Sequence, residues 1–194
     1  MINVAVGTNG NTYPVHESLI CASSDFFQTA RKPEWSEGNP GVVDLSDEKP
    51  DIFEVYLHWL YFKTLSTVQD QPPTSNPEYL ELAQCYVLGE KLLDVKFKNA
   101  VIDAMIDVLV NQPEDDVFIP GPSTIKTIYE GTMEGSLVRT LLVDIWAARA
   151  GKSGKTDLDE CPPEFAIDLA KEFLDLNLMV DSSWEDSMEK YHEK

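Results

Sequence analysis

The sequence predicts an α+β fold, and three observations lead to that prediction. Short apolar segments separated by turn residues are confined to residues 2–45 of the 194-residue chain. Segments with apolar residues at helical spacing fill most of the remainder. No apolar run approaches the roughly 20 residues that a membrane-spanning helix needs. Because the strands come first and the helices follow, we expect a small three-stranded sheet flanked by a cluster of helices, with additional helices at the C-terminus.

Three segments are expected to be strands. Residues 2–6 alternate apolar and small side chains. Residues 9–11, Asn-Gly-Asn, are typical of a hairpin turn. Residues 12–15 should therefore return beside the first strand, and Pro14 places them at an edge of the sheet because proline donates no ladder hydrogen bond. Residues 42–45, Val-Val-Asp-Leu, are expected to be the third strand.

Two short helices are expected between the second and third strands. They cover residues 16–22 and 24–31. Ser23, Ser24 and Asp25 lie at the junction, where their side-chain oxygens can accept hydrogen bonds from the free N–H groups of a helix start.

Three longer helices follow the third strand. Pro50 suits a first helical turn, and residues 52–62 are apolar almost all round, so this helix should form the centre of the core. Residues 66–77 contain three prolines and are expected to be a surface loop. A helix should then run from Pro77 to about Leu93. The next helix is predicted by a stripe of Phe97, Val101, Ala104, Met105 and Val108.

Helical spacing returns in the last third of the chain. One stripe consists of Val138, Leu141, Leu142 and Ile145, and another of Phe165, Leu169, Phe173 and Leu176. We expect residues 1–112 to be the first domain and the acidic, Pro- and Gly-containing residues 113–123 to be a linker. Residues 124–180 are then a helical extension, and residues 181–194 a polar tail with frayed structure.

The charge balance excludes several partners. The chain has 15 Lys+Arg against 34 Asp+Glu, which gives a formal net charge of −19. Binding a phosphate backbone or an anionic membrane surface requires a local excess of basic residues, so we expect neither nucleic acid nor membrane as a partner. The three cysteines are odd in number and widely spaced, which favours reduced thiols and an intracellular protein, cytoplasmic or nuclear.

One loop resembles a nucleotide-binding motif without matching it. Residues 151–156 end in Gly-Lys-Thr, as a P-loop does, but Arg149 occupies the position that requires glycine. The loop also follows a predicted helix, whereas a P-loop follows a strand. A flexible basic loop is the favoured interpretation. A nucleotide-binding protein or enzyme that uses Gly151–Thr156 remains the alternative from a different functional class.

No pattern of catalytic or metal-ligating residues accompanies the three histidines. His16 opens a predicted helix and is interpreted as a structural cap or a buried hydrogen-bonding residue. His58 lies in the apolar helix and is interpreted as a core histidine. A Cys–His nucleophile has no local signature here, so we expect no enzyme activity, no cofactor and no metal.

Residues 15–27, Val-His-Glu-Ser-Leu-Ile-Cys-Ala-Ser-Ser-Asp-Phe-Phe, resemble the BTB/POZ family motif. Its recurring elements are a hydrophobic residue, His, Leu and then Ser-x-x-Phe. In this chain the His of the motif is His16 and its Leu is Leu19. The Ser-x-x-Phe element begins with Ser24 and Asp25.

The resemblance continues along the chain in the family's order. Residues 53–61 are similar to the family's helix that ends in Leu-Tyr, and residues 86–94 and 98–104 resemble the fungal branch. Residues 128–130, 139–146 and 162–165 are similar to the C-terminal helical extension of fungal BTB proteins. Two features depart from the pattern: Met1 stands almost at the first strand, and the usual Tyr-Thr-Gly is replaced by residues 61–63, Tyr-Phe-Lys.

The resemblance implies a non-catalytic module for protein–protein interaction. BTB domains self-associate, and the first helices offer Phe26 and Phe27 as candidates for a homodimer contact. Some members recruit a cullin scaffold for ubiquitin ligation through a hydrophobic-x-Glu motif, which Trp35 and Glu37 match. A plain scaffold and a cullin adaptor both remain open, as does simple core packing of Trp35 with a solvated Glu37. With a charge of −19, any dimer must rest on an apolar patch and tighten with salt, and another partner's docking face should be basic.

Overall fold

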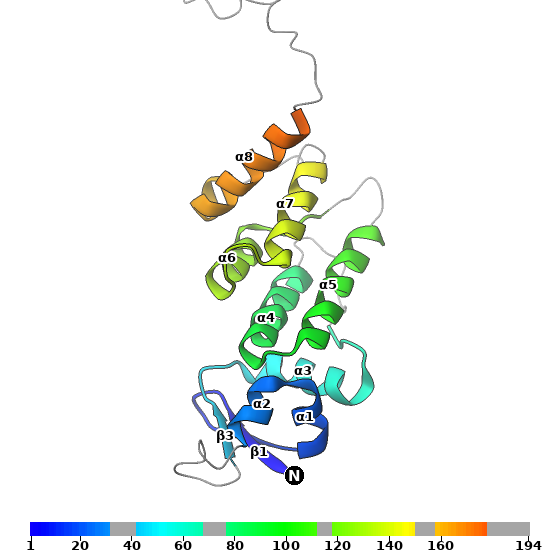
Figure 1. The fold of residues 1–194 in the computed structure, drawn as a ribbon, viewed down its shortest axis with the longest axis vertical. Coiled ribbons are helices and arrows are strands. Elements are labelled where there is room, and N and C mark those ends of the chain that lie inside the picture. Colours follow the sequence, from blue (N-terminus) through cyan, green and yellow to red (C-terminus); the bar gives the residue numbers. More distant parts are fainter. Residues whose placement is uncertain (32–41, 68–76, 112–117, 150–157, 178–194) are drawn as a thin grey trace, which may run out of the picture.

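The computed structural model describes residues 1–31, 42–67, 77–111, 118–149 and 158–177 of the chain. The elements follow the predicted order, with three strands near the N-terminus and helices after them. The molecule is elongated, and the sheet and helix α8 lie at its opposite ends (Figure 1).

The three strands form one mixed sheet. They are β1 (Ile2–Val6), β2 (Asn11–Val15) and β3 (Val42–Leu45), in the order β2-β1-β3. Strand β1 pairs antiparallel with β2 and parallel with β3. Pro14 therefore lies on an edge strand, as predicted, which is where a sheet tolerates proline.

One face of the sheet is apolar and buried. Val4 lies opposite Tyr13 on β2 and opposite Val43 on β3, which fixes the register of both pairings. Because successive side chains of a strand point to opposite faces, this register brings one apolar set to the helices. The buried set comprises Ile2, Val4, Val6, Val15, Val43 and Leu45.

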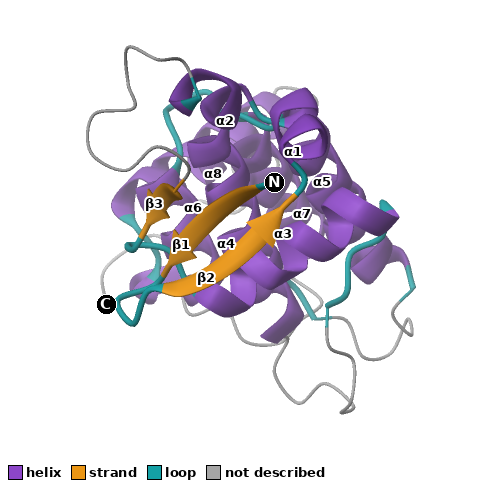
Figure 2. Cartoon of the chain, turned by 90° about the horizontal axis from the view of Figure 1, so that it is seen from below, coloured by secondary structure: helices purple, strands orange, loops and turns teal. Residues whose placement is uncertain are grey.

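Five helices complete this half of the molecule. They are α1 (Glu17–Ser23), α2 (Asp25–Ala30), α3 (Pro50–Phe62), α4 (Pro77–Leu92) and α5 (Val95–Val110). Seen from below, the sheet lies in front of the helices (Figure 2). Pro50 and Pro77 occupy first positions of helices, and Ser24 caps α2, as the sequence predicts.

Helix α3 supplies the centre of this core, although its last turn is exposed. Its buried side chains are Ile52, Phe53, Val55, Tyr56, Trp59 and Leu60. Tyr61 and Phe62 are exposed, so the prediction that the whole apolar helix is buried is wrong at this end. His58 is half-buried and not a core residue, and its Nδ1 lies 2.8 Å from the carbonyl oxygen of Thr64.

The second half of the chain is helical and packs onto α4. Its elements are α6 (Pro122–Gly131), α7 (Leu137–Arg149), the 3₁₀ turn η2 (Leu158–Glu160) and α8 (Pro163–Asn177). Helix α6 begins at Pro122, so the C-terminal end of the expected linker 113–123 is the first turn of a helix. Proline is well suited to that position because the first helical N–H groups have no intrahelical partner.

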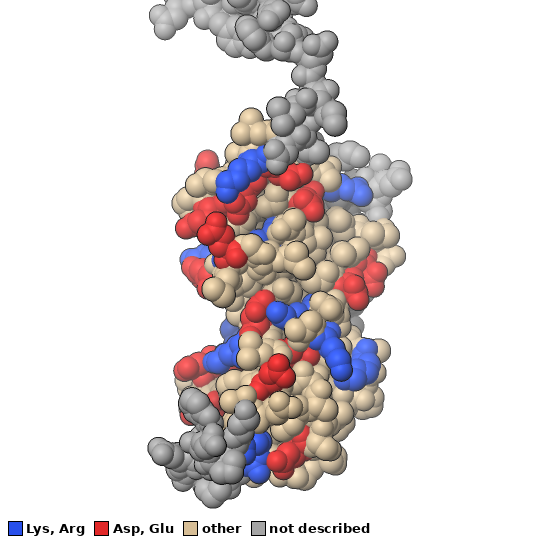
Figure 3. Space-filling model, in the orientation of Figure 1, with Lys and Arg blue, Asp and Glu red and all other residues tan. Residues whose placement is uncertain are grey.

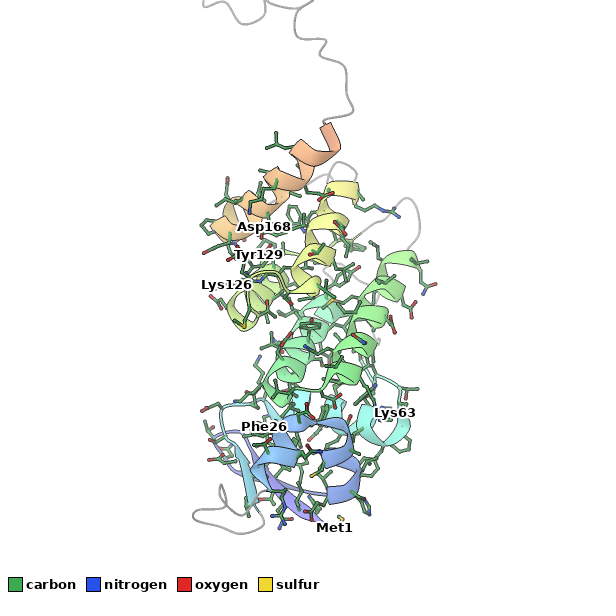
Figure 4. All side chains as sticks on the ribbon, in the orientation of Figure 1. Met1, Phe26, Lys63, Lys126, Tyr129 and Asp168 are labelled. Atoms are coloured by element: carbon green, nitrogen blue, oxygen red, sulfur yellow. The ribbon has the colours of Figure 1, made fainter. Side chains whose placement is uncertain are left out.

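A polar network joins the three C-terminal helices. The Tyr129 hydroxyl of α6 donates to Asp168 Oδ2 of α8 at 3.0 Å, and both residues are labelled in Figure 4. Arg139 of α7 lies over the Tyr129 ring at 4.4 Å and donates to the carbonyl oxygens of Tyr129 and Thr132 at the end of α6. Among the described residues, no helix is long and apolar enough to cross a membrane.

Candidate protein-interaction surface

The motif histidine lies at the junction of β2, α1 and α3. His16 is exposed and makes no side-chain cap for α1, so its interpretation as a cap or a buried residue is wrong. Its backbone N–H donates to the Tyr61 hydroxyl at 3.1 Å, and its Nδ1 lies 2.8 Å from the same oxygen. His16 therefore ties the start of α1 to the end of α3. Leu19, one turn later, is half-buried against the core.

Ser24 connects the two motif helices to the rest of the domain. Its buried hydroxyl accepts a hydrogen bond from the Phe27 N–H at 3.2 Å, which caps α2. The same hydroxyl donates to the carbonyl oxygen of Leu92 at 2.5 Å, at the end of α4. Asp25 is exposed in the first turn of α2, where a carboxylate is stabilised by the positive end of the helix dipole.

Asp94 is a buried hub that the sequence reasoning missed. It is fully buried and caps α5, and its Oδ1 accepts a hydrogen bond from the Phe97 N–H at 3.0 Å. Its Oδ2 accepts from the Ser23 hydroxyl at 2.5 Å and from the Tyr56 hydroxyl at 3.1 Å. Burial, reinforced by this carboxylate, raises the pKa of Tyr56 far above its usual range, so the hydroxyl stays a donor. An Asp placed just before a helical stripe is typical of a helix cap. Nothing in the sequence indicates that the Asp94 side chain is buried.

The two phenylalanines proposed for self-association differ in how deeply they are buried. Phe27 is fully buried, with its ring edge-on to Phe26 at a centroid distance of 5.3 Å. Because the core already surrounds Phe27, its ring is not available to a second subunit. Phe26 is half-buried and lies between α2 and the lower end of α4 (Figure 4). Only Phe26 remains as a candidate contact residue.

The turn between α4 and α5 exposes two further apolar side chains. Leu93 is 55% exposed and Val95 is 61% exposed. Leu93 also has a left-handed backbone conformation, with φ of 51°. The N–H of Asp94 closes the end of α4 by donating to the Gly89 carbonyl oxygen at 3.0 Å. Glycine is the usual residue at this position of such a helix end, so its occupation by leucine carries a conformational cost.

Phe26, Leu93 and Val95 together define what we term the α2–α4 surface. The Ser24–Leu92 and Ser23–Asp94 hydrogen bonds hold the α4–α5 turn against the α1–α2 junction. An apolar surface of this kind can bury area against another protein. Such burial contributes about 25 cal/mol per Å² before the costs of association.

The face drawn in Figure 3 carries both acidic and basic side chains, and several basic ones gather at mid-height on its right side. Several cations of this half are paired with carboxylates. Arg31 lies 2.9 Å from Glu17, and Lys91 lies 2.6 Å from Glu48. Such exposed pairs contribute little to stability, but they reduce the positive charge available to an anionic partner.

Two of the described thiols, those of Cys21 and Cys85, are not activated. Burial raises the pKa of Cys85 to about 12 and also raises the pKa of Cys21. Both therefore carry their proton at neutral pH, whereas the thiolate is the nucleophilic form. Among the residues that the structure describes, no group of three or more His, Cys, Asp or Glu is placed to hold a metal ion.

Two sequence-predicted sites lie outside the described residues. Trp35 and Glu37 fall within residues 32–41, and the Gly151–Thr156 loop falls within residues 150–157. Their geometry therefore adds nothing to the cullin and nucleotide hypotheses. The polar tail at residues 181–194 also lies outside them.

The family comparison covers slightly less than the first half of the chain. A model described as BTB/POZ domain matches residues 2–94, which run from β1 to the residue that caps α5. The match ends before α5, although the sequence reasoning placed that helix within the first domain at residues 1–112. No curated protein matches the chain.

Proposed function

Residues 2–94 of the chain are a BTB/POZ domain, a protein-interaction module, and we propose that the chain acts as a self-associating scaffold or adaptor. The observation that carries this proposal is the exposure of Leu93 and Val95 in a turn that the Ser24–Leu92 hydrogen bond holds against the start of α2, the helix that contains half-buried Phe26. Leucine in a left-handed conformation is unfavourable for the isolated fold, and residues held in such conformations cluster at functional positions.

Self-association through the α2–α4 surface would bury this apolar area twice. A two-fold axis brings the same patch of each subunit into contact, so one exposed leucine supplies two contacts. The contact must outweigh repulsion between two chains of net charge −19. An apolar contact is suited to this because it does not depend on opposite charges.

Light scattering on the full chain at micromolar concentration tests the proposal. We expect a dimer for the wild type and a monomer for the Leu93→Asp/Val95→Asp double variant. Both side chains are exposed, so the substitutions should leave the fold intact, which circular dichroism checks. Met133→Asp is the matched control, because Met133 is 85% exposed and lies after α6, and it should remain dimeric. A strictly monomeric wild type would contradict self-association while leaving the family unchanged.

A second candidate function, recruitment of a cullin scaffold, is favoured by Trp35-Ser36-Glu37. This sequence matches the hydrophobic-x-Glu motif implied by the family resemblance and precedes β3. In a pull-down with a cullin N-terminal domain, Trp35→Ala and Glu37→Ala should each weaken binding, whereas Ser36→Ala should not. Absence of binding by the wild type would eliminate the adaptor role.

A further inference from the structure

The end of helix α3 exposes an aromatic and a basic side chain next to each other. Phe62 is 69% exposed, and its ring lies beside that of His58 with the centroids 4.9 Å apart. Lys63 follows it and is also exposed, with its Nζ 4.1 Å from the centroid of the Trp59 ring. Because a cation is attracted to the face of an indole ring, this contact holds the ammonium group in place at the surface.

Helix α5 begins beside this end of α3. The Trp59 ring packs on Phe97 of α5, with the two centroids 5.1 Å apart. Lys96 precedes Phe97 and is exposed. We call Phe62, Lys63 and Lys96 the α3–α5 patch. Figure 3 shows basic side chains gathered at mid-height on its right side, which is the side on which Figure 4 labels Lys63.

The segments that form the patch contain no acidic residue, although the chain is rich in them. Residues 55–67 and 95–102 include three lysines but no Asp or Glu, whereas the whole chain has 34 Asp+Glu against 15 Lys+Arg. One of these lysines, Lys98, is paired with a carboxylate of α4. Within the described ranges, Lys63 and Lys96 have no carboxylate partner. Their charges are therefore available to a carboxylate of another molecule.

Carboxylates limit the size of the patch. Asp94, just before α5, is buried and already accepts three hydrogen bonds. Asp103 lies two turns along α5 from Lys96, or about 10.5 Å along the helix axis. Glu78 lies beyond the end of α3, where it accepts a hydrogen bond from the Thr67 hydroxyl at 2.9 Å. A positive area of this size suits a few carboxylates and not a long polyanion such as a nucleic-acid backbone.

Lys63 has a backbone conformation that is unfavourable for lysine. It ends α3 in the left-handed region, with φ of 59°. Glycine is the usual residue where a helix ends in this way, and residues 61–63 replace the Tyr-Thr-Gly of the family pattern by Tyr-Phe-Lys. The replacement costs conformational energy and places Phe62 and Lys63 at the surface. Costs of this kind cluster at functional positions.

We propose that the α3–α5 patch binds a short acidic segment of another protein, with an apolar side chain of that segment on Phe62 and its carboxylates on Lys63 and Lys96. The net charge of −19 favours basic partners for the molecule as a whole. Attraction within one contact depends on the charges nearby, because the Debye length is about 8 Å at physiological ionic strength. The proposal does not rest on self-association through the α2–α4 surface, although Lys96 follows Val95 in sequence.

Fluorescence anisotropy with a labelled synthetic peptide and the full chain tests the proposal. The probe is Asp-Glu-Asp-Leu-Phe-Asp-Glu-Asp, and two control peptides replace its acidic residues by Lys or its Leu-Phe by Ser-Ser. We expect saturable binding of the probe and binding of each control peptide weaker by about tenfold. Added salt should weaken binding of the probe, because opposite charges attract less when they are screened. The proposed dimer should respond to salt in the opposite way, so the two proposals can fail separately.

Variants of the patch should lose affinity for the probe. We expect Lys63→Gln/Lys96→Gln to weaken binding by about five- to tenfold, and Phe62→Ser to weaken it as well. The matched control is Lys126→Gln/Lys171→Gln, which removes the same charge from exposed lysines of α6 and α8 and should bind as the wild type does. Lys63→Gly separates binding from folding. It should weaken binding without lowering the free energy of unfolding, because glycine adopts the left-handed conformation freely.

Three results would overturn the proposal. The first is no saturable binding of the probe by the wild type at protein concentrations up to about 0.1 mM. The second is an equal loss of binding in Lys126→Gln/Lys171→Gln, because net charge alone would then explain the attraction. The third is a change in the oligomeric state of Lys63→Gln/Lys96→Gln in light scattering, because a second copy of the chain would then occupy the patch.

Discussion

At the scale of single residues, Asp94 shows how one side chain holds several elements in place. Its two oxygens receive hydrogen bonds from α1, from α3 and from the backbone at the start of α5. The cap of α5 is a local contact, whereas Ser23 and Tyr56 are 71 and 38 residues away in sequence and meet Asp94 only in the fold. Because a buried carboxylate is stable only when its lone pairs are satisfied, Asp94 and its donors depend on one another.

Replacing Asp94 by Ala should therefore destabilise the domain strongly. The change removes a helix cap and leaves the Ser23 and Tyr56 hydroxyls without an acceptor, and we expect a loss of about 3–4 kcal/mol in the free energy of unfolding. Asp94→Asn keeps a side-chain carbonyl that can cap α5 and should lose less. Urea unfolding measures both, and a loss below about 1 kcal/mol for the Ala variant would contradict the role of Asp94 as a hub.

Leu93→Gly should stabilise the domain instead of destabilising it. Glycine adopts the left-handed conformation without the steric cost that leucine bears, so we expect a gain of roughly 0.5–1 kcal/mol in the free energy of unfolding. Val95→Gly is the matched control: it is similarly exposed but lies in the first turn of α5, where glycine should cost about 0.5 kcal/mol. Chemical denaturation under monomeric conditions measures the free energy of unfolding of both variants. A destabilised Leu93→Gly would show that contacts of the leucine side chain contribute more to stability than its backbone strain costs.

At the scale of elements, the sequence predicted local features better than contacts. Turn and cap residues act on their neighbours, so the hairpin near Gly10, the Ser24 cap and the helix start at Pro50 could all be predicted. The exposed end of α3 could not, because burial depends on which elements pack beside it. The same limit applied to Phe27, since an apolar side chain looks alike in sequence whether it fills a core or contacts a partner. The end of the helix near Leu93 was predicted, but its left-handed backbone conformation was not, because leucine occupies a position where glycine would have been the signal.

The contact between α4 and α6 depends on a glycine. A Cβ on Gly131 would overlap the Val87 side chain, so the two helices approach as closely as they do because Gly131 has none. Gly131→Ala should cost about 1–3 kcal/mol in the free energy of unfolding, despite the better helix propensity of alanine. Adding Val87→Ala should restore part of the loss, because it removes the overlapping methyl groups. Gly121→Ala, where a new Cβ meets nothing within 4 Å, should change the free energy of unfolding by less than about 1 kcal/mol.

At the scale of the whole molecule, the packing of α6 on α4 makes the C-terminal helices part of the same body as the BTB/POZ domain (Figure 1). The family match ends at residue 94, in the turn that presents Leu93 to solvent. Of the α2–α4 surface, Phe26 lies within the matched region, Leu93 lies at its end and Val95 lies just beyond it.

The net charge of −19 gives the proposed dimer a specific dependence on salt. Repulsion between like-charged subunits is screened as ionic strength rises, with a Debye length of about 10 Å at 0.1 M and about 3 Å at 1 M. An apolar contact through the α2–α4 surface is not weakened by this screening. The dissociation constant of the dimer should thus fall by about tenfold, or roughly 1.4 kcal/mol, over that range of sodium chloride. Sedimentation velocity at several protein concentrations measures it, and sucrose in place of salt serves as a control for general effects on apolar burial. A dimer that weakens with salt would instead require a contact between opposite charges, and the α2–α4 surface would then be the wrong interface.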